Sequence, residues 1–425
     1  MTIAPSLRCL ALAACFGGVA APALAQDSAA LINALIRKGI LTSQEAEDIR
    51  ADLTREAAAV IPAPAFGGGK STDRLSVGMR MQLQYAGIDT DVRGAAFGPV
   101  ATNQFFTRRM YLTLKAGVGG NWGATMTYDF ASGGYDDAIV EWRPNPDLSF
   151  NFGLRKVNVA YEERATSGHL KSIERSGITR YFVESNNGRR LGAASYRIGA
   201  FLDGKKEINQ RTNFVYSAAI TDPQRNETFS LASASGDATS NKLAFWGNAG
   251  IAGRLPDNGG TWIGGVGVGF LPDQGGVGTA NLGRGFDLTI YSVYFDAQIG
   301  RYGLMAEYLT ADIERGASAT RDAKPAGWFI QPSFLFSDTL EFVVRYQRLD
   351  TDGRGVQLGD VVRSAPTGAT MNKFDEWYAG ANWYLRGNDL KFQLGALSGK
   401  TKETVTGAPA EAKTVGVRSQ LQIQF

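Results

Sequence analysis

From Leu75 onward, apolar and polar residues alternate with a period of two, the spacing of a β-strand whose two faces meet different surroundings. In the first stretch Leu75, Val77, Met79, Met81, Leu83 and Tyr85 alternate with Arg80, Gln82 and Gln84, and in the last Val415, Val417, Leu421, Ile423 and Phe425 alternate with Arg418, Gln420, Gln422 and Gln424. Such segments are typical of a membrane barrel with lipid outside and water inside. Aromatic residues at many strand ends fit the girdles found at membrane interfaces.

This pattern predicts an all-β fold, a sixteen-stranded antiparallel transmembrane β-barrel over residues 75–425. The predicted strands are 75–88, 105–117, 121–131, 135–143, 148–156, 189–202, 212–221, 241–253, 261–271, 284–299, 302–313, 326–336, 340–350, 374–385, 389–400 and 413–425. Tight turns alternate with long polar connections, as in bacterial outer-membrane barrels, and an even strand number leaves no edge. Two connections fit poorly: 132–134 is short where a long one is expected, and 203–211 is long for a turn.

The residues before the strands divide into three predicted segments. Residues 1–25 have the features of a secretory signal peptide, with Arg8, an apolar run and the small-residue site Ala23-Leu24-Ala25. A lipoprotein signal ending at Cys15 is the alternative, although it would leave only about five apolar residues after Arg8. Residues 26–60 show helical spacing, either as a short amphipathic hairpin or as a periplasmic association element with a coiled-coil seam. Residues 61–74, rich in proline and glycine, predict a linker.

The longest connection, residues 157–188, contains the only histidine, His169, and basic residues precede and follow it. A connection of about thirty residues is uncommon in a compact domain and is usually functional or disordered. We expect it to fold into the barrel as a constriction loop that narrows the pore.

Several short stretches of the chain carry a family resemblance. They are Lys38-Gly39-Ile40-Leu41-Thr42, Arg108-Arg109-Met110-Tyr111-Leu112, Tyr128-Asp129-Phe130, Asp137-Ala138, Phe152-Gly153-Leu154-Arg155-Lys156, Glu163-Arg164-Ala165-Thr166-Ser167, Ile173-Glu174-Arg175, Arg190-Leu191-Gly192, Asn382-Trp383-Tyr384-Leu385 and Leu421-Gln422-Ile423-Gln424-Phe425. Together they resemble the phosphate-selective porin O and P family. The resemblance implies a trimeric channel in outer-membrane lipid whose third surface loop folds inward. Arg164 matches a basic residue that precedes Ala-Thr-Ser in phosphate-specific members, and Phe425 resembles the terminal aromatic that the barrel-assembly machinery reads. A dense arginine ladder on consecutive lumen strands is not visible in this sequence.

Charges at lumen-facing positions are close to balance. Eight cations (Arg80, Arg109, Lys115, Arg143, Arg155, Arg345, Lys391, Arg418) stand against seven acids (Asp129, Asp137, Glu141, Asp287, Glu307, Glu341, Glu376). The candidates for pore-lining or anion-binding residues are Arg80, Arg109, Lys115, Arg143, Arg155, Lys156, Arg164, Arg175, Arg189 and Arg190. The alternative for each is an ion pair that braces the wall and the loop. We interpret His169 as an ordinary loop residue rather than a ligand.

Other function classes have little support. A net charge of +3 is too small to indicate nucleic acid binding, and one histidine builds neither a histidine metal site nor a supported Ser-His-Asp arrangement. We expect no enzyme activity, no metal and no cofactor. Three hypotheses remain: an outer-membrane channel that prefers small anions such as phosphate or polyphosphate, a general porin with little charge selectivity, and a non-conducting structural or binding barrel.

Overall fold

The computed structural model describes residues 74–93, 100–184, 189–223, 242–256, 259–272, 287–318, 320–357, 370–404 and 411–425. The predicted signal peptide, helical segment and almost all of the linker lie outside these residues. Within the described residues no helix combines the length and the apolar character needed to cross a membrane.

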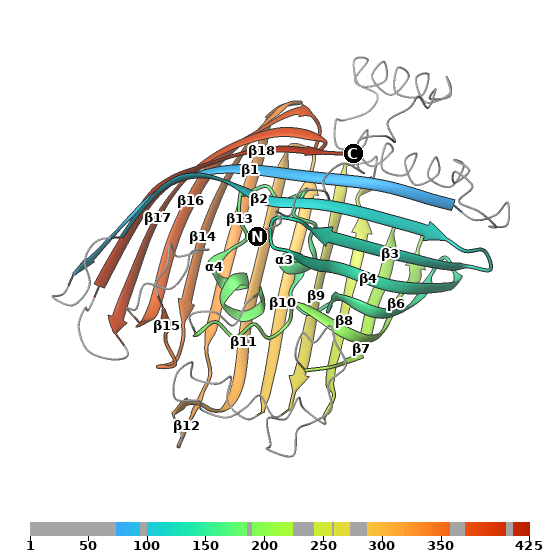
Figure 1. Ribbon diagram of the computed structural model, residues 1–425, viewed down its shortest axis with the longest axis horizontal. Coiled ribbons are helices and arrows are strands. Elements are labelled where there is room, and N and C mark those ends of the chain that lie inside the picture. Colours follow the sequence, from blue (N-terminus) through green and yellow to red (C-terminus); the bar gives the residue numbers. More distant parts are fainter. Residues whose placement is uncertain are drawn as a thin grey trace, which may run out of the picture. The chain divides into compact units, whose positions relative to one another are not determined.

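Eighteen strands follow one another along the described chain (Figure 1). The first nine are β1 (Arg74–Arg93), β2 (Val100–Gly117), β3 (Trp122–Asp129), β4 (Gly134–Asn145), β5 (Leu148–Lys156), β6 (Tyr196–Asn209), β7 (Thr212–Thr221), β8 (Ala244–Arg254) and β9 (Gly260–Leu271). The others are β10 (Leu288–Ile299), β11 (Tyr302–Ser318), β12 (Arg321–Ala323), β13 (Ala326–Ser337), β14 (Leu340–Asp350), β15 (Val356–Gln357), β16 (Thr370–Arg386), β17 (Leu390–Thr404) and β18 (Glu411–Gln424).

These strands close into a barrel, as the alternating pattern predicts. Each strand pairs antiparallel with its neighbours, and β1 pairs with β18 through fourteen residue pairs from Arg80–Gln424 to Arg93–Glu411. The short β12 and β15 are side additions, because β11 pairs directly with β13 and β14 with β16. The ring therefore has sixteen strands, and the predicted fold class is confirmed.

The two faces of the wall differ as a membrane barrel requires. On β1, Val77 and Leu83 are 54% and 42% exposed on the outer face, whereas Gln82 and Gln84 are buried on the inner face. The same alternation places Val415 and Val417 outside and Gln420 and Gln422 inside. Apolar side chains thus face the position of lipid, and polar side chains face the lumen.

One predicted strand begins too early. The sequence places a strand at 189–202, but β6 covers Tyr196–Asn209, so the inward connection extends to residue 195. Residues 191 and 193 alternate like a strand, yet their N–H groups donate to Tyr181 and Phe182 inside the loop (2.7 and 2.8 Å). The connection at 203–211, which looked long for a turn, is mostly strand, because residues 203–207 pair with β7.

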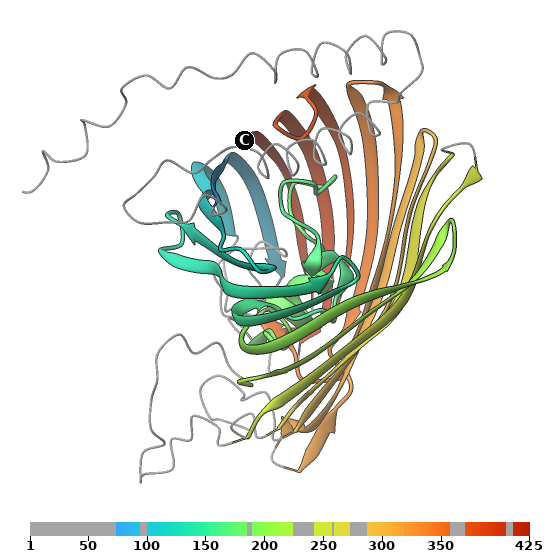
Figure 2. The same ribbon diagram turned by 90° about the vertical axis from the view of Figure 1, so that its right-hand side faces the viewer.

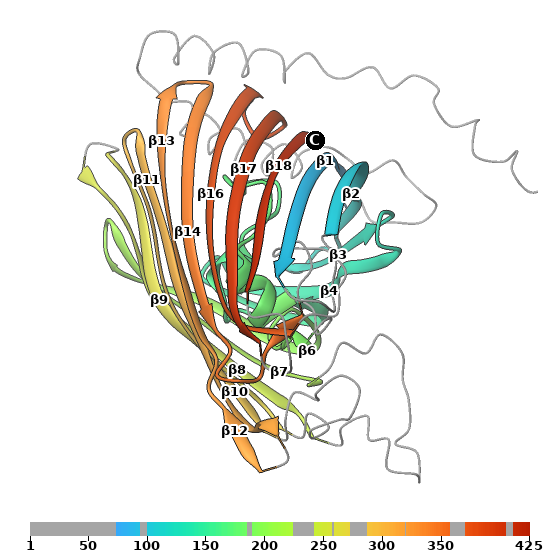
Figure 3. The same ribbon diagram turned by 90° about the vertical axis from the view of Figure 1, so that its left-hand side faces the viewer.

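The long connection between β5 and β6 lies inside the curve of the sheet, and Figures 2 and 3 show its helical turns there from opposite sides. It contains α3 (Tyr161–Arg164), α4 (Gly177–Thr179) and the π-helical turn η1 (Arg180–Glu184). Ile178, Phe182 and Leu191 are fully buried and share one apolar cluster with wall residues of β6 to β16. We call residues 157–184 and 189–195 the inward loop.

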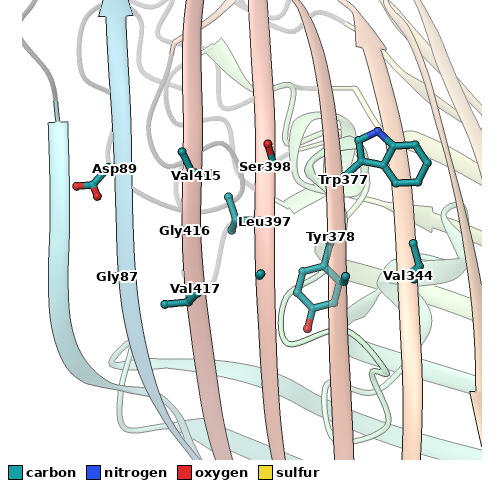
Figure 4. Close-up of a pocket in the computed structure, with 12 residues that line it drawn as sticks. Gly87, Asp89, Val344, Trp377, Tyr378, Leu397, Ser398, Val415, Gly416 and Val417 are labelled. Carbon is teal, nitrogen blue, oxygen red and sulfur yellow. The ribbon is translucent and has the colours of Figure 1, made fainter.

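A shallow hollow lies on the opposite, outer surface of the wall (Figure 4). The outward side chains of Val344, Trp377, Val415 and Val417 line it, together with small residues of β17. Because these side chains alternate with the inward ones on the same strands, the hollow belongs to the lipid-facing surface and not to the pore.

Candidate pore constriction

The tip of the inward loop lies across the junction of β1 with β18. Gln82 donates to the carbonyl of Ser167 (3.1 Å) and Gln422 to that of Gly168 (3.0 Å). Lys391, fully buried on β17, donates to the carbonyls of Gly168 and Leu170 (2.8 and 3.0 Å). Side chains of the wall therefore bind the backbone of the loop, which holds the tip at a defined height in the lumen.

Glutamine side chains connect these contacts into a row across the same strands. Gln82 bonds to Gln422 (2.7 Å), Gln84 to Gln420 (2.8 Å), and Gln420 to Gln393 (2.8 Å). An amide both donates and accepts, so it can pair sideways with the next strand while it binds the loop. The lumen-facing polar positions of the sequence form this row.

Glu162 organises the second half of the loop. Its carboxylate accepts the backbone N–H (3.0 Å) and hydroxyl (2.7 Å) of Ser176 and the hydroxyl of Thr179 (2.5 Å). Ser176 in turn caps α4, because its hydroxyl accepts the N–H of Thr179 (3.0 Å). Arg345 of β14 stands 3.6 Å from the same carboxylate. A buried charge is tolerated here because hydrogen bonds and a cation compensate it.

Arg175 is a brace of the loop, as the ion-pair alternative states. It is buried, donates to three backbone carbonyls at residues 162, 163 and 165, and pairs with Glu163 (3.3 Å) and Glu184 (3.3 Å). Lys156 pairs with Glu163 from the end of β5 (2.9 Å). Burial alone would raise the pKa of Glu163, but Arg175 and then Lys156 hold that pKa below its ordinary value.

Arg164, the last residue of α3, has different surroundings. Its guanidinium donates to Asn248 (3.3 Å) and to the hydroxyl of Tyr294 (3.4 Å), and lies over the rings of Tyr161 and Tyr294 (5.5 and 5.7 Å). Those two rings stack at 4.8 Å. Within the described residues no carboxylate pairs with Arg164, and its side chain is only half-buried.

The other candidate cations fall into three groups. Arg155 pairs with Asp203, and the exposed Arg143 pairs with Glu141 (2.7 Å). Neutral partners hold Arg80 (Gln424, 2.9 Å; Ser167, 3.0 Å) and the buried Arg109 (Gln82, 2.7 Å), whereas Lys115 is exposed.

Arg189 and Arg190 lie at the end of the inward loop. Arg189 donates to the carbonyl of Arg354 (3.0 Å), and the side chain of Arg354 donates back to the carbonyl of Arg189. Arg190 is buried. The ten candidates therefore do not converge on one site.

The structure adds Arg108, which the sequence did not single out as a lumen residue. Strict alternation would send Arg108 outward, since Arg109 points inward. The register between β1 and β2 shifts after the pair Gln82–Arg109, and the next pair is Leu83–Thr107. This bulge lets both arginines reach the lumen, where Arg108 pairs with Glu174 of the loop (2.7 Å). No local pattern in the sequence announces the bulge.

Acidic groups also stand at the lumen. Asp296 of β10 accepts the hydroxyl of Tyr161 (2.7 Å), and Asp137 of β4 faces inward among Lys115, Arg155 and Lys156. His169, on the loop tip, contributes no charge near neutrality. Its setting inside the barrel, followed by the charges of Lys391 and Arg80, lowers its pKa to about 4.

This chain is similar to a known family in sequence and to solved structures in fold. The sequence matches the family described as "Phosphate-selective porin O and P" over residues 75–425. An anion-selective porin from Comamonas acidovorans is similar in fold, with 13% identity, 83% of this chain and 100% of that chain covered, and a TM-score of 0.53. The outer membrane channel DcaP of Acinetobacter baumannii is 13% identical, with 85% of this chain and 100% of that chain covered and a TM-score of 0.49. The in-vitro folded trimer form of OmpT of Vibrio cholerae is 11% identical, with 82% of this chain and 99% of that chain covered and a TM-score of 0.46.

No curated protein sequence matches the chain. The family match nevertheless covers most of it, and the closed sixteen-stranded barrel agrees with that match. The chain belongs to the phosphate-selective porin O and P family and is an outer-membrane porin, a channel for the passive diffusion of small hydrophilic solutes.

Proposed function

We propose that this porin favours small anions and that phosphate-type oxyanions bind at Arg164. One observation carries the proposal: Arg164 has only neutral hydrogen-bond partners among the described residues, at 3.3 and 3.4 Å. A guanidinium has five N–H donors, so several remain for a solute. Charge-assisted hydrogen bonds to phosphate are stronger than those between neutral groups.

The neighbouring cations of the loop explain why Arg164 stands apart. Lys171 pairs with Glu341 (2.8 Å), and Arg175 and Arg180 both pair with Glu184. A cation beside a carboxylate presents little net field to a passing ion. Selectivity depends on local charge where the pore is narrow, and among Arg164, Lys171, Arg175 and Arg180 that contribution falls to Arg164.

The preference for anions is weak, because acidic side chains also line the lumen. Asp296 of β10 accepts the hydroxyl of Tyr161, whose ring lies under Arg164, and Asp137 of β4 adds a second negative charge elsewhere at the lumen. This observation favours a second candidate function, a general porin with little charge selectivity. In neither candidate does the channel act as an enzyme or bind a cofactor.

We also propose that the porin is a homotrimer joined through β3 to β5. β3 and β5 are eight and nine residues long, at or below the roughly nine to eleven residues that a tilted strand needs to span a membrane. Trp122, Trp142 and Phe150 stack on this low wall, with ring centroids 6.0 and 5.4 Å apart. Another copy covers such a face better than lipid does.

The exposed terminal Phe425 supports recognition by the barrel-assembly machinery. Its side chain is 73% exposed at the end of β18, while its backbone pairs with Met79 through two hydrogen bonds of 3.1 Å.

The reversal potential of purified trimers in a planar bilayer under a potassium chloride gradient tests the anion proposal. We expect an anion-selective potential and a reduction of current by added phosphate. Arg164→Ala should remove the selectivity and raise the half-blocking phosphate concentration about tenfold, the loss of a charge-assisted hydrogen bond. Arg348→Ala is the matched control, because Arg348 is an exposed cation on the outer face of β14.

Three outcomes contradict the proposal in different ways. Cation selectivity, or none, leaves the general porin. An anion-selective channel that is unchanged by Arg164→Ala moves the anion site elsewhere. Verified trimers that conduct no current return the barrel to a structural or binding role.

A further inference from the structure

Glu307 is a buried carboxylate of the wall that holds the inward loop by its backbone. It lies on β11, is 2% exposed, and faces the lumen. Its two oxygens accept the N–H of Tyr161 (2.7 Å) and the N–H of Glu162 (3.0 Å), and the hydroxyl of Ser292 donates to it as well (3.1 Å). Among the described residues no cation pairs with it, and its hydrogen-bond partners are these neutral donors.

The two N–H groups belong to the turn that carries Arg164. Tyr161 and Glu162 are the first residues of α3 and Arg164 is the last. The backbone N–H of Arg164 donates to the carbonyl of Ala160 (3.2 Å), which closes that turn. A single closed turn moves as a unit, so a carboxylate that fixes its first two N–H groups also fixes the position from which the arginine side chain starts.

Other contacts hold the rest of the loop independently of Glu307. The tip is bound by Gln82, Gln422 and Lys391, and the second half is bound through the apolar cluster. Just before α3, Val159 lies against Gly267 of β9, where any side chain would meet its carbonyl oxygen at 2.4 Å. Loss of Glu307 should therefore loosen the start of α3, which keeps its contacts with Asp296, Ser176 and Arg175, while the loop stays inside the barrel.

We propose that Glu307 is a positioning residue for selectivity, which places the Arg164 guanidinium in the solute path. This inference rests on the anion site proposed at Arg164. The Glu307 carboxylate then has two opposing effects. By its charge alone Glu307 opposes anions, whereas by its hydrogen bonds it holds the cation that attracts them.

The sign of the change in Glu307→Gln distinguishes these effects. Removing a negative charge from the lumen should raise anion selectivity if charge alone matters. If positioning matters, selectivity falls toward that of Arg164→Ala, because an amide NH₂ group faces a backbone donor that the carboxylate accepted. Glu307→Asp keeps the charge but shortens the side chain, and should also lower selectivity. Glu376→Gln is the matched control, a buried wall carboxylate on β16 that accepts the Gln347 amide (2.5 Å).

A second readout follows the position of residue 164 without any anion. The only cysteines of the chain, Cys9 and Cys15, lie in the predicted signal peptide, so Arg164→Cys supplies a single thiol in the mature protein. Its rate of reaction with a charged methanethiosulfonate reagent should rise about fivefold when Glu307→Gln is added, because α3 opens more often from the wall. Glu376→Gln should leave that rate unchanged.

The outcomes separate this inference from the function on which it rests. Unchanged thiol reactivity in Glu307→Gln overturns the positioning role. So does a rise in anion selectivity, or a further loss of selectivity when Glu307→Gln is combined with Arg164→Ala. If Arg164→Ala alone leaves selectivity intact, the anion site fails, and the thiol rate by itself decides whether Glu307 positions residue 164.

Discussion

The inward loop has two halves that the barrel holds by different means. Residues 178–184 and 189–194 bury Ile178, Phe182, Val183 and Leu191 completely in an apolar cluster with the wall. Residues 162–176 are held by buried carboxylates, by Arg175 and by amides of the wall. One half of the loop is thus held by apolar packing, and the other half is held by hydrogen bonds and ion pairs.

This difference shows how the work is divided within one loop. Burial of apolar surface is strong but has no direction, so it keeps the loop inside the lumen without setting where each charge stands. Hydrogen bonds to buried charges depend steeply on distance and angle, so they set those positions. The apolar half should control whether the loop stays in place, and the polar half should control what the channel selects.

The strongest test removes a large side chain from the apolar half. Phe182→Ala should lower the free energy of unfolding by about 3–5 kcal/mol, because the side chain is fully buried and leaves a cavity. Phe182→Leu should cost only about 1 kcal/mol, since it nearly fills the same space. Denaturant unfolding of the purified protein measures both. Equal midpoints for the alanine and leucine variants would contradict an apolar core between loop and wall.

In the polar half, Arg175→Met should destabilise the loop by about 3 kcal/mol, because it leaves the carboxylate of Glu163 buried without its guanidinium. The double variant with Glu163→Gln should recover part of that loss, since the carboxylate is no longer buried without the guanidinium, although Lys156 loses its ion-pair partner. Thermal unfolding gives the stability, and single-channel current noise reports movement of the loop. Strictly additive losses would show that the two side chains do not act as a pair.

Acid should loosen the polar half only. The pKa of Glu163 is held below its ordinary value of 4.5, so its stabilising contribution is complete above that value and fades as the pH falls through the lowered pKa. Current noise should therefore increase only once the pH falls below the ordinary value of 4.5. The acid step should vanish in Glu163→Gln, while Phe182→Leu keeps it. An acid step that survives Glu163→Gln would assign the transition to another group.

The smallest effect is expected at the loop tip. With a pKa of about 4, His169 is neutral between pH 5 and 8 and adds no charge to the pore. His169→Asn should leave the reversal potential unchanged across that range. A titration of selectivity near pH 6.5 that this substitution abolishes would show that the histidine is charged in the open channel.

The strands could be predicted because contact with lipid imposes a period of two on each of them. Where that constraint ends, the pattern misleads. Leu191 and Ala193 alternate like a strand, but Arg189 and Gly192 have positive φ angles (68° and 55°), and the segment bonds to η1 instead of the wall. A strand and a loop edge with the same alternation differ only in what they pair with.

The inward direction of charges could also be predicted, but their partners could not. Alternation placed Arg155, Arg345 and Glu307 on the lumen face. Whether a cation is neutralised depends on residues far away in the chain, such as Asp203 beside Arg155 or Glu162 beside Arg345. The carry-over of family resemblance to Arg164 identified a cation without such a partner, whereas the role of Arg175 as a brace became visible only with the loop in place.

The loop tip binds the first and the last strand of the barrel at once. Ser167 accepts from Arg80 and Gln82 near the start of the barrel, and Gly168 accepts from Gln422 near its end. The tip therefore has its full set of partners only after β18 has met β1. Docking of the loop should accordingly be the last step of folding. The docked tip links β1 to β18, so the barrel can open between these two strands only after the tip has left them.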